Sequence, residues 1–163
     1  MNNESKKLTI ILPTKNRPEC LLRLLRYYVE VGFQGILCIG DSSEGEHLEC
    51  NKRQIKMFGG RLDIVYKEYP ELDEPQCSQK LANIVNTPYV AWVADDDFLV
   101  PSGLEKCMVF LEDHPDYSAA HGLSIKIKIK NNAVFGPIVD CKFIDHQAVE
   151  EAESASERLL NYA

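Results

Sequence analysis

Three consecutive aspartates, Asp95, Asp96 and Asp97, directly follow a nearly all-apolar segment, Tyr89–Ala94. Adjacent carboxylates repel one another unless a cation or a cationic ligand lies among them. Mg²⁺ and similar divalent cations prefer oxygen ligands of this kind. The triplet could equally be a solvated acidic loop before a helix, because Pro101 begins a stripe of apolar residues with helical spacing. This feature alone is therefore compatible with both a divalent-cation site and an acidic loop.

Two further polar clusters follow apolar segments earlier in the chain. Pro13–Arg17 follows the apolar segment Leu8–Leu12. Asp41–Ser43 comes just after Ile36–Ile39 in the same way. If these segments are parallel strands, their carboxyl ends meet at one edge of a sheet, where open α/β sheets bind ligands. Cations, hydroxyls and carboxylates gathered there suit a ligand with a base, a ribose and phosphates, and a divalent cation would stabilise a departing diphosphate.

The elements expected to position these clusters alternate between strand and helix. The alternation repeats four times up to the triplet, which is typical of βαβ units and a parallel sheet. The expected strands are Leu8–Leu12, Ile36–Ile39, Leu62–Tyr66 and Tyr89–Ala94, and the expected helices begin near Pro18, Glu46, Cys77 and Pro101. We expect the fourth strand to be buried on both faces, with Trp92 in the core.

The last third of the chain has a different pattern. Ser118–Ala120 predicts a short strand. Strict alternation in Ile125–Lys130 predicts one arm of a hairpin that turns into Ala133–Val139. Gln147–Tyr162 has the spacing of a terminal helix. We expect a single domain over residues 1–163, an α/β fold with a Rossmann-type, mostly parallel sheet flanked by helices and a C-terminal β-hairpin.

Composition and charge argue against several classes of protein. The net charge of −7 disfavours a general affinity for nucleic acid or anionic membranes. The six cysteines include no CxxC pair, which indicates reduced core thiols rather than a zinc site or a disulfide framework. No apolar run reaches the ~20 residues of a transmembrane segment, and the N-terminus lacks the pattern of a signal peptide. We therefore expect a cytoplasmic enzyme or binding domain.

The sequence resembles the N-terminal half of a family 2 glycosyltransferase with the GT-A fold. The resemblance covers about residues 7–122 and rests on four stretches, Ile10–Pro18, Ile39–Ser43, Lys80–Asn83 and Ala94–Pro101. It implies that Pro13, Thr14 and Arg17 line a pocket for base and ribose, that Asp41 binds the base, typically uracil, and that Lys80 and Asn83 lie near the base or diphosphate.

The aspartate triplet matches the Asp-x-Asp motif of that family. The resemblance implies that Asp95 and Asp96 contact the donor and that Asp97 binds Mn²⁺ or Mg²⁺ through the diphosphate. Alternation along an extended strand would put Asp95 and Asp97 on one side, so Asp95 is a second candidate metal ligand. The three aspartates are thus the candidate catalytic residues.

The implied reaction is glycosyl transfer from a nucleoside-diphosphate sugar, expected to be a UDP-sugar, to a hydroxyl of a saccharide, lipid or protein. This chain has Gly40 before a single Asp41, where the family usually has two adjacent acids. Four acids lie downstream outside any general-base motif, namely Asp140, Asp145, Glu150 and Glu151. Residues 123–163 could be a truncated acceptor region, so a non-catalytic nucleotide-sugar-binding module is the first alternative. A metal-dependent nucleotidyltransferase is disfavoured because Pro13–Arg17 contains no glycine.

Overall fold

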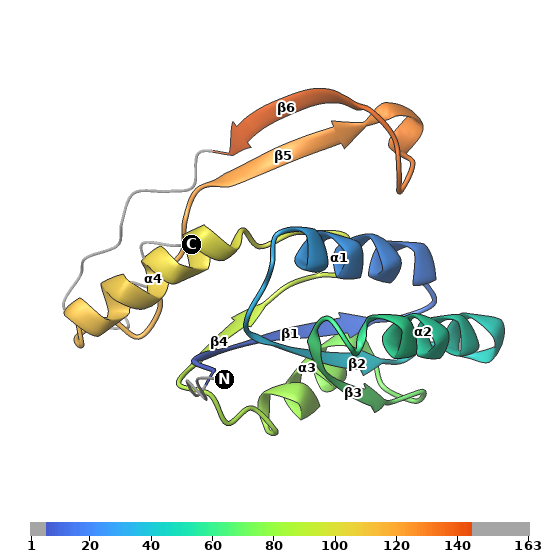
Figure 1. Cartoon of the computed structure of the whole chain (residues 1–163), viewed down its shortest axis with the longest axis horizontal. Helices are drawn as coiled ribbons and strands as arrows, with labels where there is room; N and C mark the ends of the chain where they lie inside the picture. The colour runs from blue at the N-terminus through green and yellow to red at the C-terminus, as the bar shows by residue number, and fades with distance from the viewer. Residues whose placement is uncertain (1–5, 145–163) are drawn as a thin grey trace. The chain divides into compact units, whose positions relative to one another are not determined.

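The computed structural model describes residues 6–144 and divides the chain into two compact units, residues 1–121 and 122–163. We describe each unit by itself. The first unit alternates strand and helix (Figure 1), in the order β1 (Leu8–Thr14), α1 (Pro18–Glu30), β2 (Ile36–Asp41), α2 (Gly45–Phe58), β3 (Asp63–Glu68), α3 (Glu74–Ala82), β4 (Tyr89–Trp92) and α4 (Pro101–Asp113).

The four strands of the first unit form one parallel sheet in the order β3-β2-β1-β4. Ile11 in β1 lies in register with Cys38 of β2 on one side and with Trp92 of β4 on the other. All four strands therefore end at the same edge, as the alternation predicts. The expected α/β fold is confirmed.

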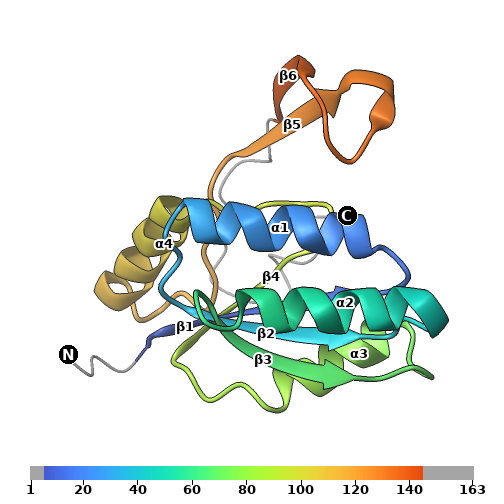
Figure 2. The ribbon, with the colours of Figure 1, turned by 45° about the vertical axis from the view of Figure 1, so that its right-hand side comes forward.

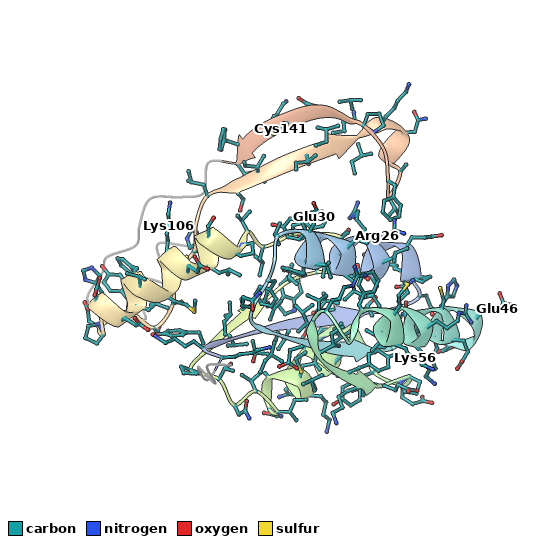
Figure 3. All side chains as sticks on the ribbon, in the orientation of Figure 1. Arg26, Glu30, Glu46, Lys56, Lys106 and Cys141 are labelled. Atoms are coloured by element: carbon teal, nitrogen blue, oxygen red, sulfur yellow. The ribbon has the colours of Figure 1, made fainter. Side chains whose placement is uncertain are left out.

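One face of the sheet carries the main core of the first unit. Alternate residues of β1 and β2, such as Ile10 and Leu37, are fully buried there. Helix α1 presents a stripe of buried residues to this face, and Figures 1 and 2 show α1 and α2 on the side of the sheet opposite to α3. The outer sides of the helices are polar, and exposed charged residues such as Arg26, Glu30 and Lys56 are labelled in Figure 3. Burial of this apolar stripe is what holds α1 on the sheet.

The opposite face is covered mainly by the short helix α3. Its Cys77 and Leu81 pack against Ile11 and Cys38 in a smaller core cluster. A Cβ atom on Gly40 would lie 2.3 Å from the Cys77 sulfur, so β2 and α3 approach each other where only glycine fits. This contact explains why this chain has glycine before Asp41.

The fourth strand differs from the expectation. It ends at Trp92 rather than Ala94, and it is an edge strand of the sheet. Trp92 is 49% exposed, so its expected place in the core is wrong. The reason is that β4 has a neighbouring strand on one side only. The helix on the face that carries Trp92 is α3, which has only nine residues and leaves the indole half-exposed.

Helix α3 begins at Glu74, three residues before the expected start. The Asp73 carboxylate accepts a hydrogen bond from the Gln76 amide, and the Gln76 side chain accepts one from the Asp73 amide. This capping box fixes the first turn. The expected strand at Ser118–Ala120 is absent, because these residues have no regular structure.

The second unit contains a β-hairpin, β5 (Ser124–Ile129) and β6 (Ile138–Ile144), paired antiparallel. The expected hairpin is confirmed, but its second arm begins at Ile138 rather than Ala133. The connection between the two strands, residues 130–137, begins with a 3₁₀ segment, Lys130–Asn132, in which Asn131 has a φ of 59°. The expected terminal helix, Gln147–Tyr162, lies outside the described residues. Among the helices that are described, none has the length and apolar character needed to cross a bilayer.

Candidate functional site

The first loop of the sheet edge is joined to the aspartate triplet by short polar contacts. The Thr14 hydroxyl donates to Asp95 Oδ2 at 2.7 Å. Arg17 pairs with Asp95 Oδ1 through Nη1 at 2.7 Å and with Asp96 Oδ2 through Nη2, also at 2.7 Å. One guanidinium thus bridges two adjacent carboxylates. In this structure Arg17 is the cation that lies between Asp95 and Asp96.

The two carboxylates differ in their electrostatic environment. Asp95 is 4% exposed, and burial raises its pKa although Thr14 and Arg17 act in the opposite direction. The hydrogen bond from Arg17 instead lowers the pKa of the more exposed Asp96. Contact with Asp96 also raises the pKa of Arg17, which therefore stays protonated. Arg17 is held at this edge by charge-assisted hydrogen bonds, the stronger kind of polar contact.

Arg23 is a second cation at the triplet that sequence reasoning missed. It lies on α1, and its Nη2 donates to the backbone oxygen of Asp96 at 2.8 Å. Its guanidinium carbon lies 5.1 Å from the centre of the Phe98 ring, within cation–π range. No local pattern predicts this contact, because Arg23 and Asp96 are 73 residues apart.

Asp97 has a different environment from the other two aspartates. The triplet lies in a turn, in which the Asp97 amide donates to the Ala94 oxygen at 3.1 Å. The expected extended strand through the triplet is therefore wrong, and strand alternation does not relate Asp95 to Asp97. The Asp97 side chain is exposed, and no hydrogen bond or ion pair reaches it from the residues that the structure describes.

These environments decide how the triplet fits a divalent cation. Within residues 6–144, no group of three or more His, Cys, Asp or Glu side chains could hold a metal by itself. Mg²⁺ bound with a nucleotide commonly takes one or two carboxylates and completes its shell with phosphate oxygens and water. The unpartnered carboxylate of Asp97 fits this arrangement. Asp95 fits it less well, because Thr14 and Arg17 occupy both of its oxygens.

Asp41 is fully buried at the end of β2. Its Oδ1 accepts from the Ser43 amide at 2.8 Å, and its Oδ2 accepts from Asn51 at 2.9 Å and from the Tyr66 hydroxyl at 2.6 Å. Burial and the contact with Asp41 raise the pKa of Tyr66. Asp41 is thus connected to α2 and β3, and in this structure it presents no surface to a ligand.

Asn16 ties the loop after β1 to the loop after β2. The backbone N–H of Asn16 donates to the Ser43 hydroxyl at 2.7 Å, and the side-chain oxygen of Asn16 accepts from the backbone N–H of Glu44 at 3.0 Å. Asn16 has a φ of 55°, a left-handed conformation that asparagine tolerates better than most residues. This turn holds Thr14 and Arg17 on either side of it at the sheet edge.

A cavity of about 280 Å³ opens between the loop after β1, the start of α3 and the end of β4. Four of the expected site residues line it, namely Pro13, Thr14, Arg17 and Asp95. Six residues without an expected role also line it, namely Lys15, Ser42, Glu74, Cys77, Trp92 and Ala94. The Ser42 hydroxyl is buried beside the Cys77 thiol, and its contact with that thiol lowers the thiol's pKa, although burial raises it.

The remaining expected residues are not part of this lining among the residues that the structure describes, namely Asp41, Lys80, Asn83, Asp96 and Asp97. Lys80 and Asn83 are exposed at the C-terminal end of α3, and within the described chain they are not part of the cavity lining. Glu74 lies at the other end of that helix. The pattern Asp73-x-x-Gln76 is a capping-box signature that could have placed the start of α3, and with it Glu74, at the sheet edge.

The α/β fold resembles the GT-A domain of a solved structure. The chain is similar to S. aureus TarS 1–349, a glycosyltransferase, with a TM-score of 0.57 and 17% sequence identity. The match covers 77% of this chain and 36% of the TarS chain, so this chain spans little more than a third of TarS. No protein-family model matches the sequence, and no curated protein matches it. At this identity the likeness shows a common fold.

Proposed function

We propose that this chain binds a nucleoside-diphosphate sugar at the carboxyl edge of its sheet and transfers the sugar to an acceptor hydroxyl. The observation that carries the proposal is the cavity that brings Thr14, Arg17 and Asp95 together from two strand ends. Its volume of about 280 Å³ is near the lower end of the range for small-molecule sites. The similarity of the fold to a GT-A glycosyltransferase supports the class of reaction.

Hydroxyl and guanidinium groups of the cavity would bind the donor. Ser42 lines the cavity, and its hydroxyl would exchange its contact with the Cys77 thiol for a ribose hydroxyl, which can both donate and accept a hydrogen bond. Arg17 suits the diphosphate, because a guanidinium binds phosphate and carboxylate in the same two-pronged geometry. Arg17 would then exchange at least one of its carboxylate contacts for phosphate oxygens.

Mn²⁺ or Mg²⁺ would be held by Asp97 together with diphosphate oxygens. When bound, such a cation neutralises the negative charge that develops on the leaving diphosphate. Asp95 would act beside it by holding Thr14 and Arg17 in place. Asp96 would keep Arg17 protonated and oriented.

Transfer to an acceptor also needs a base within hydrogen-bond reach of the acceptor hydroxyl. Of the four downstream acids, Asp140 lies in β6, is exposed, and accepts from the Cys141 amide at 3.0 Å. Asp145, Glu150 and Glu151 lie outside the described residues. A non-catalytic donor-binding module would share the same cavity and would differ only in lacking turnover.

Release of the nucleoside diphosphate tests the proposal. The protein is incubated with UDP-, GDP- or dTDP-glucose and Mn²⁺ without acceptor, and the products are separated by chromatography. We expect slow release of one nucleoside diphosphate that stops with EDTA and in Asp97→Asn. Glu105→Asn on α4, outside the site, should leave release unchanged. Binding without release would favour the non-catalytic module. The absence of both binding and release would contradict the proposal.

A further inference from the structure

One wall of the cavity is built by Glu74 at the start of α3 and by Trp92 at the end of β4. A chain of hydrogen bonds connects these two residues through Ser78. The Trp92 indole N–H donates to the Ser78 hydroxyl at 3.1 Å, and that hydroxyl donates to Glu74 Oε1 at 2.9 Å. Because an indole N–H only donates and an ionised carboxylate only accepts, the direction of both bonds is fixed. The indole plane and the carboxylate are therefore held in a defined arrangement.

Trp92 offers an aromatic surface to a ligand in this cavity. Its side chain is 49% exposed, although its neighbour Ala91 packs against the main core. The cavity beside it is also lined by Pro13 and Cys77, which are apolar or weakly polar. A half-exposed indole next to apolar neighbours suits a planar ring, because the ring can stack on it in any in-plane orientation. Stacking alone therefore favours a nucleobase without selecting which one.

Glu74 can supply that selection. Asp41, the residue expected to bind the base, is buried and already accepts three hydrogen bonds. Glu74 is exposed, and of its two oxygens Oε1 accepts from Ser78 while no contact to Oε2 is found among residues 6–144. An ionised carboxylate only accepts hydrogen bonds, so it selects bases by the donors on their edge.

The four common bases differ in the donors that they present to a carboxylate. Guanine presents a ring N–H and an amino N–H side by side, which match the two oxygens. Uracil presents one ring N–H between two carbonyl oxygens. Adenine and cytosine present an amino group next to an unprotonated ring nitrogen, whose lone pair faces the carboxylate unfavourably.

We infer that Glu74 and Trp92 form the base-binding wall of the donor site and that this wall prefers guanine to uracil, and both to adenine and cytosine. This inference rests on the proposed function, since it concerns the nucleotide of the same donor. Glu74 is thus a specificity-determining residue and Trp92 a general base-binding residue, and neither takes part in the chemical step.

The single tryptophan of the chain provides a direct readout of this wall. GDP, UDP, CDP and ADP are titrated with Mn²⁺ present, while binding is measured by calorimetry and Trp92 emission is recorded in parallel. We expect GDP to bind most tightly, about tenfold more tightly than UDP from one additional charge-assisted hydrogen bond. Each nucleotide that binds should change the emission of Trp92.

Two variants separate stacking from hydrogen bonding. Glu74→Gln should reduce the preference for GDP over UDP about tenfold. It should also tighten the binding of CDP and ADP, because an amide can donate to a ring nitrogen. Trp92→Leu should weaken the binding of all four nucleotides by a similar factor. Glu71→Gln, three residues earlier and outside the cavity lining, makes the same change of charge and should leave the order unchanged.

The outcomes distinguish this inference from the proposed function. If none of the nucleotides binds by calorimetry, the proposed function itself is wrong. If nucleotides bind but Trp92 emission is unchanged, or if Glu74→Gln keeps the wild-type order, the base lies elsewhere and this inference is overturned while the donor site stands.

Discussion

At the scale of single residues, the aspartates at the sheet edge have three kinds of environment: buried with partners, exposed with a partner as in Asp96, and exposed without a partner among the described residues. Asp95 and Asp41 are both buried, and neighbouring donors contact both oxygens of each. Asp97 is exposed and has no side-chain partner among the described residues. The buried acids therefore hold loops in place, and Asp97 is the acid available to a cation. Two substitutions test this division.

Arg17→Met should destabilise the protein and weaken diphosphate binding together. It leaves the buried Asp95 with Thr14 as its polar partner, and because Arg17 is itself 46% exposed we expect a loss of only about 1–2 kcal/mol. Urea unfolding measures the loss, and calorimetry should show at least about tenfold weaker binding of diphosphate. Arg53→Met, an exposed change on α2, is the matched control with an expected effect within about 0.5 kcal/mol. Unchanged stability and binding in Arg17→Met would mean that the Arg17 bridge has no role.

Asp41→Asn should act on stability rather than on base selection. An amide at this site would turn its donor either toward the Ser43 backbone N–H or toward the Asn51 side-chain amide and the Tyr66 hydroxyl, so we expect a cost of about 2–4 kcal/mol in urea unfolding. Asp63→Asn, which breaks the exposed ion pair with Lys6, should cost less than about 1 kcal/mol. If Asp41→Asn instead kept full stability and changed which nucleotide binds, the base contact expected from the sequence would be right and our structural interpretation wrong.

At the scale of elements, the central strands and their helices follow from local patterns, whereas the edge of the sheet does not. Apolar runs predict β1 and β2, and the spacing of Leu21, Leu24 and Leu25 predicts the buried face of α1. The exposure of Trp92 depends on the strand order β3-β2-β1-β4, which no local pattern encodes. The contact of Arg23 with Asp96 is missed for the same reason, since it joins residues 73 apart, and the contact of Ser78 with Trp92 depends on how α3 packs against β4.

The close approach of α3 and β2 is a second feature at this scale, and it can be tested at Gly40. Gly40→Ala would place a methyl group 2.3 Å from the Cys77 sulfur, so we expect a destabilisation of about 2–3 kcal/mol. Adding Cys77→Ala should recover part of this loss, and a double-mutant cycle by urea unfolding measures the coupling. Gly60→Ala, where a Cβ meets nothing within 4 Å, should be close to neutral. Additive effects of Gly40→Ala and Cys77→Ala would show that this contact does not limit the packing of α3.

At the scale of the whole molecule, the chain has two compact units that differ in the hydrophobic core and the cavity that they contain. Both hydrophobic clusters of the described chain, and every residue that lines the cavity, belong to residues 1–121. The described part of the second unit is a two-stranded hairpin with exposed apolar residues such as Ile127 and Phe143. An isolated hairpin is marginally stable at best. The stability of the donor site should therefore reside in the first unit.

Hydrogen exchange tests this division of the chain. We expect amides of β1 and β2 to be protected to near the free energy of global unfolding, and amides of β5 and β6 to exchange faster by orders of magnitude. Mass spectrometry of peptic fragments resolves the two regions in one experiment. Equal protection of the hairpin and the central strands would show one cooperative unit in place of two.

The central claim is that this sheet edge binds a nucleoside diphosphate through a divalent cation, and its most direct test is one calorimetric titration. GDP and UDP are titrated into the protein with and without Mn²⁺, and the titration is repeated with Asp97→Asn. We predict measurable binding with Mn²⁺, binding weaker by at least about tenfold without it, and a similar loss in Asp97→Asn, because the proposed cation would link the Asp97 carboxylate to the diphosphate. Binding that is equally tight without Mn²⁺, or no binding under any of these conditions, would contradict the account.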